Sequence, residues 1–276
     1  MQSNSWRTPR SSAAAAAALA TTAIATPPPT TTTAAGAPAR SSWTPSPASA
    51  SSSTRQHGPK QRTSANYRGD PTNPNNQSAD IPEEDNTSVF IENLPPDATA
   101  REVLLHLRGT GKIYALSVGA PTARIPTSCA KIVYWDRRGV DRLLLLRAGG
   151  KFVLRGHDPI VKLNWHKTAP QPASSRSRVI VVEGPSRLVN QIRLDALFAV
   201  FFTWDTDEVL VHWQREGRTR LEYRFASHRA QASEAYRRIT QAANRSEDGL
   251  PEVEMSPEEK TLWKEVRVRW GKDPCE

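Results

Sequence analysis

The chain has 276 residues and a formal net charge of +9 at pH 7, so it has room for one or two domains and suits an anionic partner. Its two cysteines, Cys129 and Cys275, exclude a disulfide framework and a cysteine-rich metal site, and they fit a reducing compartment. The sequence has no uninterrupted apolar run long enough to span a bilayer, so we expect no membrane-spanning helix.

Residues 1–80 consist mainly of Ala, Ser, Thr, Pro and Gln, with almost no large aliphatic side chains. Such a segment buries too little apolar surface to offset the entropy of ordering it, so we expect a disordered, low-complexity tail. We expect an intracellular protein of the nucleus or cytoplasm. The alanine-rich residues 13–25, which follow Arg7 and Arg10, leave a mitochondrial transit peptide as the less favoured alternative.

The first folded region opens with a predicted strand, residues 89–94, of sequence VFIENL. Because side chains alternate between the two faces of a strand, Phe90 and Glu92 lie opposite the inward Val89 and Ile91. A ring on the outer face of a sheet needs a flat partner, such as an unpaired nucleic-acid base. A second layer of protein covering the ring is the alternative at this point.

The next elements follow at short spacing. Thr99 and Glu102 form a capping box and predict the start of a helix, and Asp136 predicts the start of a second helix. The second helix carries four successive leucines, which we expect to pack inward rather than to form a contact patch. The predicted order is strand, helix, strand, strand, helix, strand, with strands at residues 89–94, 112–118, 129–134 and 160–165.

Residues 88–167 resemble an RNA recognition motif. Residues 89–94 resemble the family's six-residue signature, including its aromatic second position, and residues 127–134 stand in the place of its eight-residue signature. The sequence departs from the family there, because Cys129 and Lys131 occupy positions that are usually aromatic. The resemblance implies an α+β, ferredoxin-like domain over residues 81–168: a four-stranded antiparallel sheet with two helices on one face.

The resemblance also implies that single-stranded RNA binds the open face of this sheet. Of the usual stacking rings only Phe90 remains, and Lys131 would supply charge or a cation–π contact where a ring is expected. The candidate RNA-binding residues are Phe90, Glu92, Cys129, Lys131, Lys162, Asn164 and Trp165.

Residues 169–177 form a predicted linker rich in Pro and Ser, and residues 178–275 repeat the pattern in weaker form. We predict strands at 178–185, 208–213, 220–225 and 266–270, a helix around the apolar residues 194–202, and a second helix capped by Ser227. An acidic insert, residues 244–265, precedes the last strand and contains a short helix capped by Ser256. This second unit resembles a divergent RNA recognition motif of the same fold.

The second unit has Ile180 where the family's first-strand ring is expected. Its predicted open face surrounds Ile180 and Val182 with arginines and offers no stacking platform. These arginines are Arg220, Arg224, Arg267 and Arg269. We expect this face to meet another protein. The acidic insert either folds back over the arginines, mimicking a phosphate chain, or is a solvated loop.

The sequence has no glycine-rich phosphate loop, no His-Glu-x-x-His, no Cys-x-x-Cys and no nucleophile elbow, so we predict no enzymatic activity, no cofactor and no metal. Two functional hypotheses remain. The first is an RNA-binding protein that uses mainly its first domain. The second is a protein–protein interaction module that keeps the fold but binds little RNA, as Cys129 and Lys131 would suggest.

Overall fold

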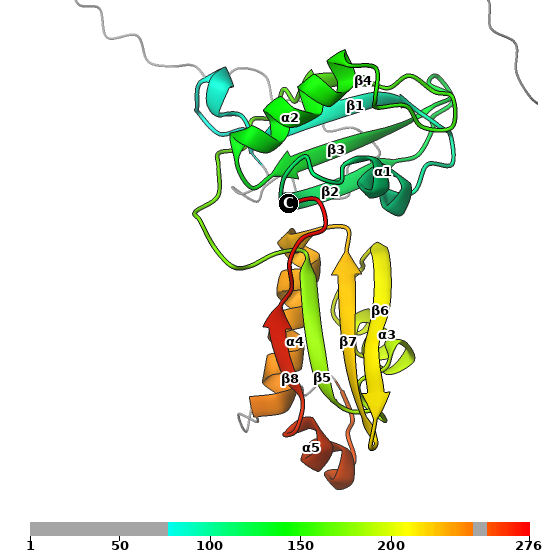
Figure 1. The fold of residues 1–276 in the computed structure, drawn as a ribbon, viewed down its shortest axis with the longest axis vertical. Coiled ribbons are helices and arrows are strands. Elements are labelled where there is room, and N and C mark those ends of the chain that lie inside the picture. The colour runs from blue at the N-terminus through cyan, green and yellow to red at the C-terminus, as the bar shows by residue number, and fades with distance from the viewer. Residues whose placement is uncertain (1–76, 245–252) are drawn as a thin grey trace, which may run out of the picture. The chain divides into compact units, whose positions relative to one another are not determined.

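The computed structural model describes residues 77–244 and 253–276 (Figure 1). Nearly all of the tail predicted over residues 1–80 lies outside the described residues, and so do residues 245–252 of the predicted insert.

The first domain contains a four-stranded antiparallel sheet in the order β2-β3-β1-β4. A short 3-10 turn, η2 (Glu83–Asp85), precedes it. The strands are β1 (Ser88–Leu94), β2 (Ile113–Gly119), β3 (Ser128–Tyr134) and β4 (Ile160–Leu163). Two helices, α1 (Ala100–His106) and α2 (Arg137–Ala148), cover one face of this sheet (Figure 1). This is the βαββαβ arrangement that the sequence predicts.

The predicted helix starts of the first domain are confirmed. The Thr99 side chain accepts a hydrogen bond from the Glu102 N–H, and the Glu102 carboxylate accepts one from the Thr99 N–H, which completes the capping box. The Asp136 side chain accepts from the Arg138 N–H and caps α2. These bonds satisfy N–H groups that have no partner inside the helix.

The core of the first domain lies between the sheet and the two helices. Val89 and Ile91 are fully buried in it, together with Leu104 of α1 and Leu143 of α2. Two of the other three leucines of the α2 run also pack against this core, whereas Leu145 is 73% exposed. The expectation that these leucines pack inward is therefore right for three of the four.

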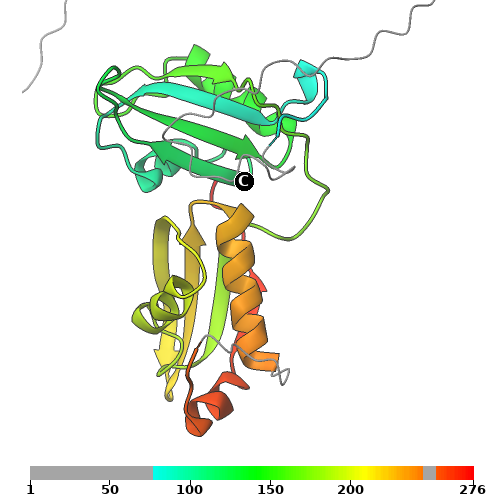
Figure 2. The same ribbon diagram turned by 180° about the vertical axis from the view of Figure 1, so that it is seen from behind.

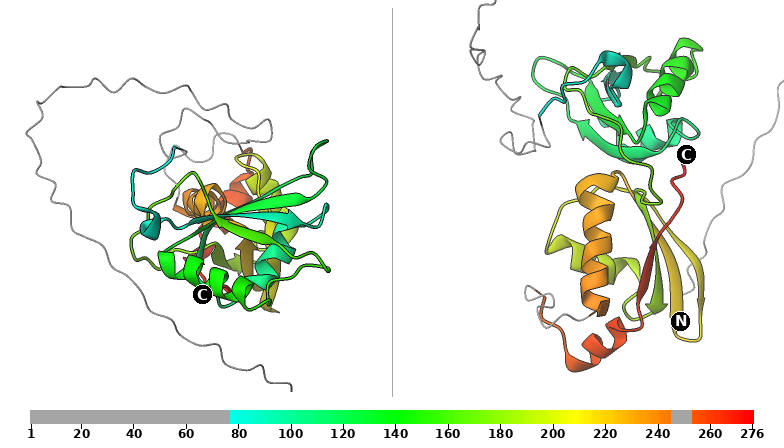
Figure 3. Two further views of the ribbon diagram at one scale, coloured as in Figure 1. Left: turned by 90° about the horizontal axis from the view of Figure 1, so that it is seen from above. Right: turned by 90° about the vertical axis from the view of Figure 1, so that its left-hand side faces the viewer.

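The second domain repeats the fold, with a four-stranded antiparallel sheet in the order β6-β7-β5-β8. Its strands are β5 (Val179–Pro185), β6 (Thr206–Arg215), β7 (Arg218–Phe225) and β8 (Arg267–Trp270). The helices α3 (Gln191–Ala199) and α4 (Ser233–Asn244) lie on the same face of the sheet (Figures 2 and 3). A further short helix, α5 (Pro257–Trp263), is capped by Ser256 as predicted and places Trp263 in the core.

The two faces of β5 are the reverse of the sequence prediction. Ile180 and Val182 are fully buried in the core, where they pair with Tyr223 and Leu221 of β7. The residue on the outer face is instead Val181, which pairs with Glu222. Because side chains alternate along a strand, an offset of one residue exchanges the two faces, and the uninterrupted apolar run of β5 contains no polar residue that would fix the choice.

Ser227 does not cap α4, contrary to the prediction. The segment η3 (His228–Ala232), which contains Ala230 in a left-handed conformation at φ 61°, separates Ser227 from the start of α4. The Ser227 hydroxyl instead accepts a hydrogen bond from the Leu116 N–H of β2 at 2.8 Å and donates one to the Leu116 carbonyl at 2.9 Å. The hydroxyl therefore satisfies backbone groups on the outer edge of the first sheet.

Asp273 and Cys275, close to the last residue, also hydrogen-bond to backbone groups at and just before the start of β2. The Asp273 carboxylate accepts a hydrogen bond from the Ile113 N–H at 2.9 Å, and the Cys275 carbonyl accepts one from the Gly111 N–H at 2.7 Å. The Cys275 side chain is fully buried among the core residues of the first domain. Residues far apart in the sequence thus contribute to one core.

A buried charge cluster supports this arrangement. The side chains of Arg178, Asp207 and Asp273 are each at most 1% exposed, and Arg178 pairs with both carboxylates at 2.9 Å. Arg178 also donates to the Phe225 carbonyl, and Arg108 of α1 pairs with Asp207 at 3.2 Å. The Arg108–Asp207 ion pair joins this cluster to the first domain.

Candidate nucleic-acid interface

Phe90 lies near the middle of the outer face of the first sheet. Its neighbours along β1, Val89 and Ile91, are fully buried under the helices, whereas Phe90 is partly exposed on the opposite face. The strand register places Phe90 between Lys131 on β3 and Lys162 on β4. The site therefore combines one ring with a cation on each side, a pattern that suits a base and its phosphates.

Lys162 is paired, but weakly. Its ammonium lies 2.7 Å from the Glu92 carboxylate, with the two side chains 56% and 40% exposed. Exposed pairs of this kind contribute about 0–1 kcal/mol, so the pair can open when a stronger anion arrives. The Glu92 carboxylate would then be free to accept a hydrogen bond.

Lys131 is partly buried on this face. Burial lowers the pKa of its ammonium group, and the nearby charge of Arg229 in η3 lowers this pKa further. Arg229 comes from the second domain, and its approach to Lys131 follows only from tertiary structure. Arg229 is thus near enough to influence the Lys131 ammonium, a proximity that sequence analysis missed.

Cys129 fills space rather than carrying charge. Burial raises the pKa of its thiol, and the Sγ atom lies 3.9 Å from the Gly119 carbonyl of β2. A Cβ atom added at Gly119 would lie 2.9 Å from this sulfur, so the small residue on β2 and the thiol on β3 fit each other. A neutral thiol here supplies an apolar contact beside the face.

The last two candidate residues lie beyond β4, which ends at Leu163, two residues earlier than predicted. The Asn164 backbone N–H and side-chain amide donate to the carbonyl and hydroxyl of Ser88, so this side chain holds the start of β1. Trp165 is 81% exposed. The register therefore gathers five of the seven candidate residues on one face and leaves Asn164 and Trp165 at its end.

The outer face of the second sheet, which corresponds to the Phe90 face of the first sheet, carries several ion pairs. Arg220 pairs with Glu183 at 2.8 Å, and Arg224 pairs with both Glu208 and Glu222 at 2.6 Å. Val181 takes the central place that Phe90 holds in the first sheet, between Glu222 on one side and Arg269 on the other.

The prediction that this second face has no ring is wrong. A bulge in β6 between Val211 and Trp213 turns Trp213 to the outer side, where it pairs with Arg220 across the strands. The guanidinium groups of Arg215 and Arg220 lie 5.1 and 5.6 Å from the Trp213 ring centre. The ring is therefore already engaged in cation–π contacts.

Arg267 and Arg269 are exposed, and neither has an acidic partner among the described residues. In the described part of the insert, Glu259 pairs with Arg193 of α3, and Glu265 pairs with Arg218. Neither of these carboxylates covers Arg267 or Arg269. The acidic residues Glu247, Asp248 and Glu252 lie outside the described residues, so the predicted lid stays a hypothesis for them.

No group of three His, Cys, Asp or Glu side chains among residues 77–244 and 253–276 is arranged to hold a metal ion. No helix in the same part of the chain has both the length and the apolar character that a membrane crossing requires.

No protein-family model matches this chain, and no curated protein matches it either. Among solved structures, the Sex-lethal RNA recognition domains 1 and 2 from Drosophila melanogaster are 16% identical, with 67% of this chain and 100% of that chain covered and a TM-score of 0.24. A Sex-lethal protein/RNA complex gives 18% identity, 67% and 99% coverage and a TM-score of 0.24. The first two RRM domains of yeast poly(U) binding protein Pub1 give 14%, 67% and 99%, with a TM-score of 0.25.

At TM-scores this low the likeness carries no inference about this chain. The fold follows from the strand order and connections of each sheet: two domains of the ferredoxin-like βαββαβ class, which is the architecture of tandem RNA recognition motifs.

Proposed function

We propose that the first domain binds single-stranded RNA on the outer face of its sheet and that Phe90 stacks on a base. The observation that carries this proposal is the place of the Phe90 ring, partly exposed and flanked across the strands by Lys131 and Lys162. This partly exposed ring lies outside the core of the first domain, because the core is on the other face of β1.

The chemistry of the face suits an unpaired strand. Stacking of one base on an aromatic ring contributes about 1–3 kcal/mol and tolerates any base. Lys162 and Lys131 would contact phosphates on either side of the ring. Glu92 would accept a hydrogen bond from a base amino group once its pair with Lys162 opens.

The second domain would add little to RNA affinity. Two arginines of its outer face, Arg220 and Arg224, are neutralised by carboxylates, and its central position holds Val181 instead of a ring. RNA phosphates would have to displace carboxylates before they could meet these arginines. We therefore assign RNA binding mainly to the first domain, with no enzymatic role.

The test is a titration of the full chain with single-stranded RNA oligomers of mixed sequence at two salt concentrations. Phe90→Ala should weaken binding by about 1–3 kcal/mol, the contribution of one stacked base. The matched control is Ile192→Ala, which removes an 84% exposed apolar side chain from α3 and should leave affinity unchanged. A parent protein that binds no oligomer at either salt concentration would support the protein-interaction module instead.

A further inference from the structure

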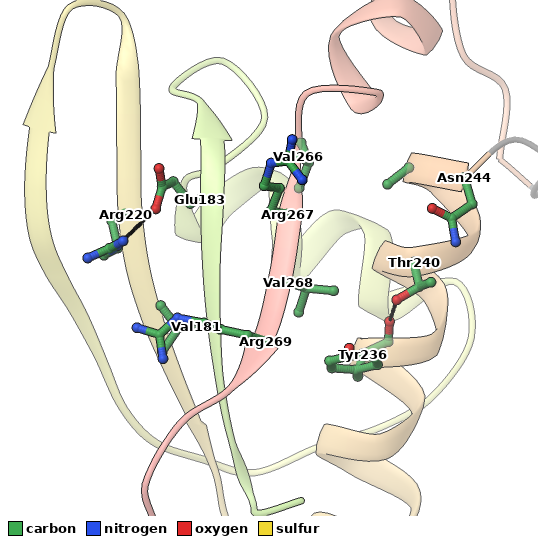
Figure 4. Close-up of a pocket in the computed structure, with 11 residues that line it drawn as sticks. Val181, Glu183, Arg220, Tyr236, Thr240, Asn244, Val266, Arg267, Val268 and Arg269 are labelled. Atoms are coloured by element: carbon green, nitrogen blue, oxygen red, sulfur yellow. Dashed lines mark hydrogen bonds and ion pairs between the residues drawn. The ribbon is translucent and has the colours of Figure 1, made fainter. Parts of the chain in front are cut away.

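A groove of about 480 Å³ lies along the edge of the second sheet, and the proposed RNA site does not use it (Figure 4). One wall is α4, which contributes Tyr236, Thr240 and Asn244. The floor and the other wall come from the outer face of the sheet and from β8, with Val181 and Val268 among the lining residues. The groove thus follows an exposed strand edge.

The edge of β8 offers unused backbone hydrogen-bonding groups. Within the described chain β8 pairs only with β5, and the Gly271 N–H donates to the Val179 carbonyl. Because hydrogen-bonded and non-bonded positions alternate in an antiparallel pair, Arg267 and Arg269 also direct their backbone groups toward β5. The N–H and C=O of Val268 therefore point away from β5, toward the groove.

The groove carries positive charge on one side. Arg267 and Arg269 stand two residues apart on the same face of β8, both are exposed, and neither has an acidic partner among the described residues. The third arginine of the groove, Arg220, is held by Glu183, as the dashed line in Figure 4 marks. No carboxylate among the described residues neutralises the two arginines of β8, so they would attract an anionic ligand.

The remaining lining does not suit a stacked base. Tyr236 is the aromatic side chain among the residues that line the groove, and its ring already stacks on Trp270 at 4.4 Å with 8° between the planes. Thr240 donates its hydroxyl to the Tyr236 carbonyl and keeps its acceptor capacity, and Asn244 presents an amide (Figure 4). These groups match a peptide backbone better than a nucleotide.

We propose that this groove binds an extended, acidic peptide segment of a partner protein, which adds to β8 as a further strand. An added strand would pair its backbone with that of Val268. A peptide that alternates acidic and apolar residues would direct every second side chain toward Arg267 and Arg269. This inference concerns the second domain and is independent of RNA binding by the first.

The charge requirement can be tested with a labelled peptide of three Glu-Val repeats, titrated against the full chain. The expected result is saturable binding that the double variant Arg267→Glu/Arg269→Glu weakens by about tenfold or more. The same variant should bind a Lys-Val peptide of equal length better than the parent protein does. Loss of Glu-Val binding without this reversal of preference would contradict direct pairing with the arginines.

The strand requirement can be tested on the peptide, which leaves the folded protein unchanged. Methylating alternate backbone nitrogens removes hydrogen-bond donors from one edge of the peptide while keeping its charge. One of the two alternate methylation patterns should abolish binding, and the other should be tolerated, because only one edge of the added strand faces β8. Equal binding by both methylated peptides would overturn strand addition.

Two further outcomes separate this inference from the proposed function. Phe90→Ala should leave Glu-Val peptide binding unchanged while it weakens RNA binding. A parent protein that ignores the Glu-Val peptide but loses RNA affinity in the Arg267→Glu/Arg269→Glu variant would overturn the proposal, because the groove would then belong to the RNA site.

Discussion

The two sheets share one topology but present different outer faces. In the first sheet the central position of the face holds Phe90, with Lys131 and Lys162 as its cross-strand neighbours. In the second sheet the same position holds Val181, with Glu222 and Arg269 beside it. The first face thus has a ring among cations, and the second has an aliphatic side chain among mixed charges.

This difference shows that the fold alone does not decide what a face binds. The inward residues of both sheets follow the same pattern, because the helices must bury an apolar surface in either case. The outer residues are not under that constraint. One face can therefore keep an aromatic ring, while the other pairs two of its arginines with carboxylates and leaves two more without an acidic partner among the described residues.

The largest expected effect comes from breaking the buried charge cluster of Arg178, Asp207 and Asp273. Arg178→Met would leave Asp273 buried without its cation and Asp207 with only the partly exposed Arg108, and breaking a buried ion pair in this way costs about 3–5 kcal/mol. Urea unfolding of the parent and the variant measures this loss. The double variant Arg178→Met/Asp273→Asn should recover part of it, because residue 273 is then neutral and Asp207 still pairs with Arg108. A loss below about 1 kcal/mol in Arg178→Met would show that water reaches the cluster.

The next effect contrasts the two faces of the first sheet. Tyr134 is fully buried, and its hydroxyl meets the Thr110 hydroxyl at 3.0 Å, so Tyr134→Ala should cost about 3–5 kcal/mol of unfolding free energy. Phe90→Ala should cost less than about 1 kcal/mol, as substitutions outside a core usually do. Thermal unfolding of both variants provides the comparison. If Phe90→Ala is as costly as Tyr134→Ala, then Phe90 is a covered core residue and the proposed RNA site loses its main support.

A third prediction exchanges the central residues of the two faces. Phe90→Val should reduce RNA affinity by about 1–3 kcal/mol, because it removes the stacking ring. Val181→Phe should raise RNA affinity by less than about 1 kcal/mol, because Val181 is only 4% exposed and the neighbouring Glu183 and Glu222 repel phosphates. Fluorescence titration with one RNA oligomer measures both. If the double variant Phe90→Val/Val181→Phe binds RNA as tightly as the parent protein, the ring alone determines RNA affinity, whatever charges surround it.

Sequence patterns predicted the elements well, because capping boxes, glycines and apolar periodicity are local signals. Both sheets and the caps at Thr99, Asp136 and Ser256 follow from such signals. The faces of β5 were predicted wrongly, since four successive apolar residues contain no alternation that would mark the inward side. Trp213 was missed for a related reason: a bulge has no distinct sequence signature, yet it moves a side chain to the other face.

Features that depend on distant residues could not be predicted. Ser227 has the residue type and position of a helix cap, yet its hydroxyl binds Leu116, which lies 111 residues earlier in the sequence. The approach of Arg229 to Lys131 and the pairing of Asp273 with Ile113 likewise join parts of the chain that no local pattern connects. The candidate RNA face is local to one domain, which explains why five of its seven residues could be placed together.

A smaller effect is expected from Lys131→Ala, which tests whether the Lys131 ammonium on the outer face of the first sheet contacts phosphate. Removing one phosphate contact should reduce the slope of log affinity against log salt by about 0.7, the value for one contact to a single strand. Lys162→Ala should have a similar effect, because its pair with Glu92 is weak. Titrations at four salt concentrations measure these slopes. An unchanged slope in Lys131→Ala would show that its partly buried ammonium does not meet phosphate.

The smallest predicted effect concerns the pH dependence of stability and His228. This histidine is the first residue of η3, the segment that also contains Arg229. His228 is 6% exposed, and its Nδ1–H donates to the Ser177 carbonyl at 2.9 Å. Burial lowers the pKa of its imidazole below the ordinary 6.5, and the charges of Arg176 and Lys112 lower this pKa further.

The sign of the pH effect follows from this direction. Because the unfolded chain takes up the proton first as pH falls, the contribution of neutral His228 is fully present above pH 6.5 and is lost as pH decreases through the lower pKa of the folded state. The unfolding free energy of the parent should therefore decrease between about pH 7 and pH 5, before carboxylates such as Glu234, whose pKa is held below its ordinary 4.5, begin to titrate. His228→Gln keeps a side-chain donor for Ser177 but cannot be protonated, so its unfolding free energy should change less over the same range. If parent and variant have the same pH slope, another group titrates there, and η3 is not held in place by a neutral imidazole.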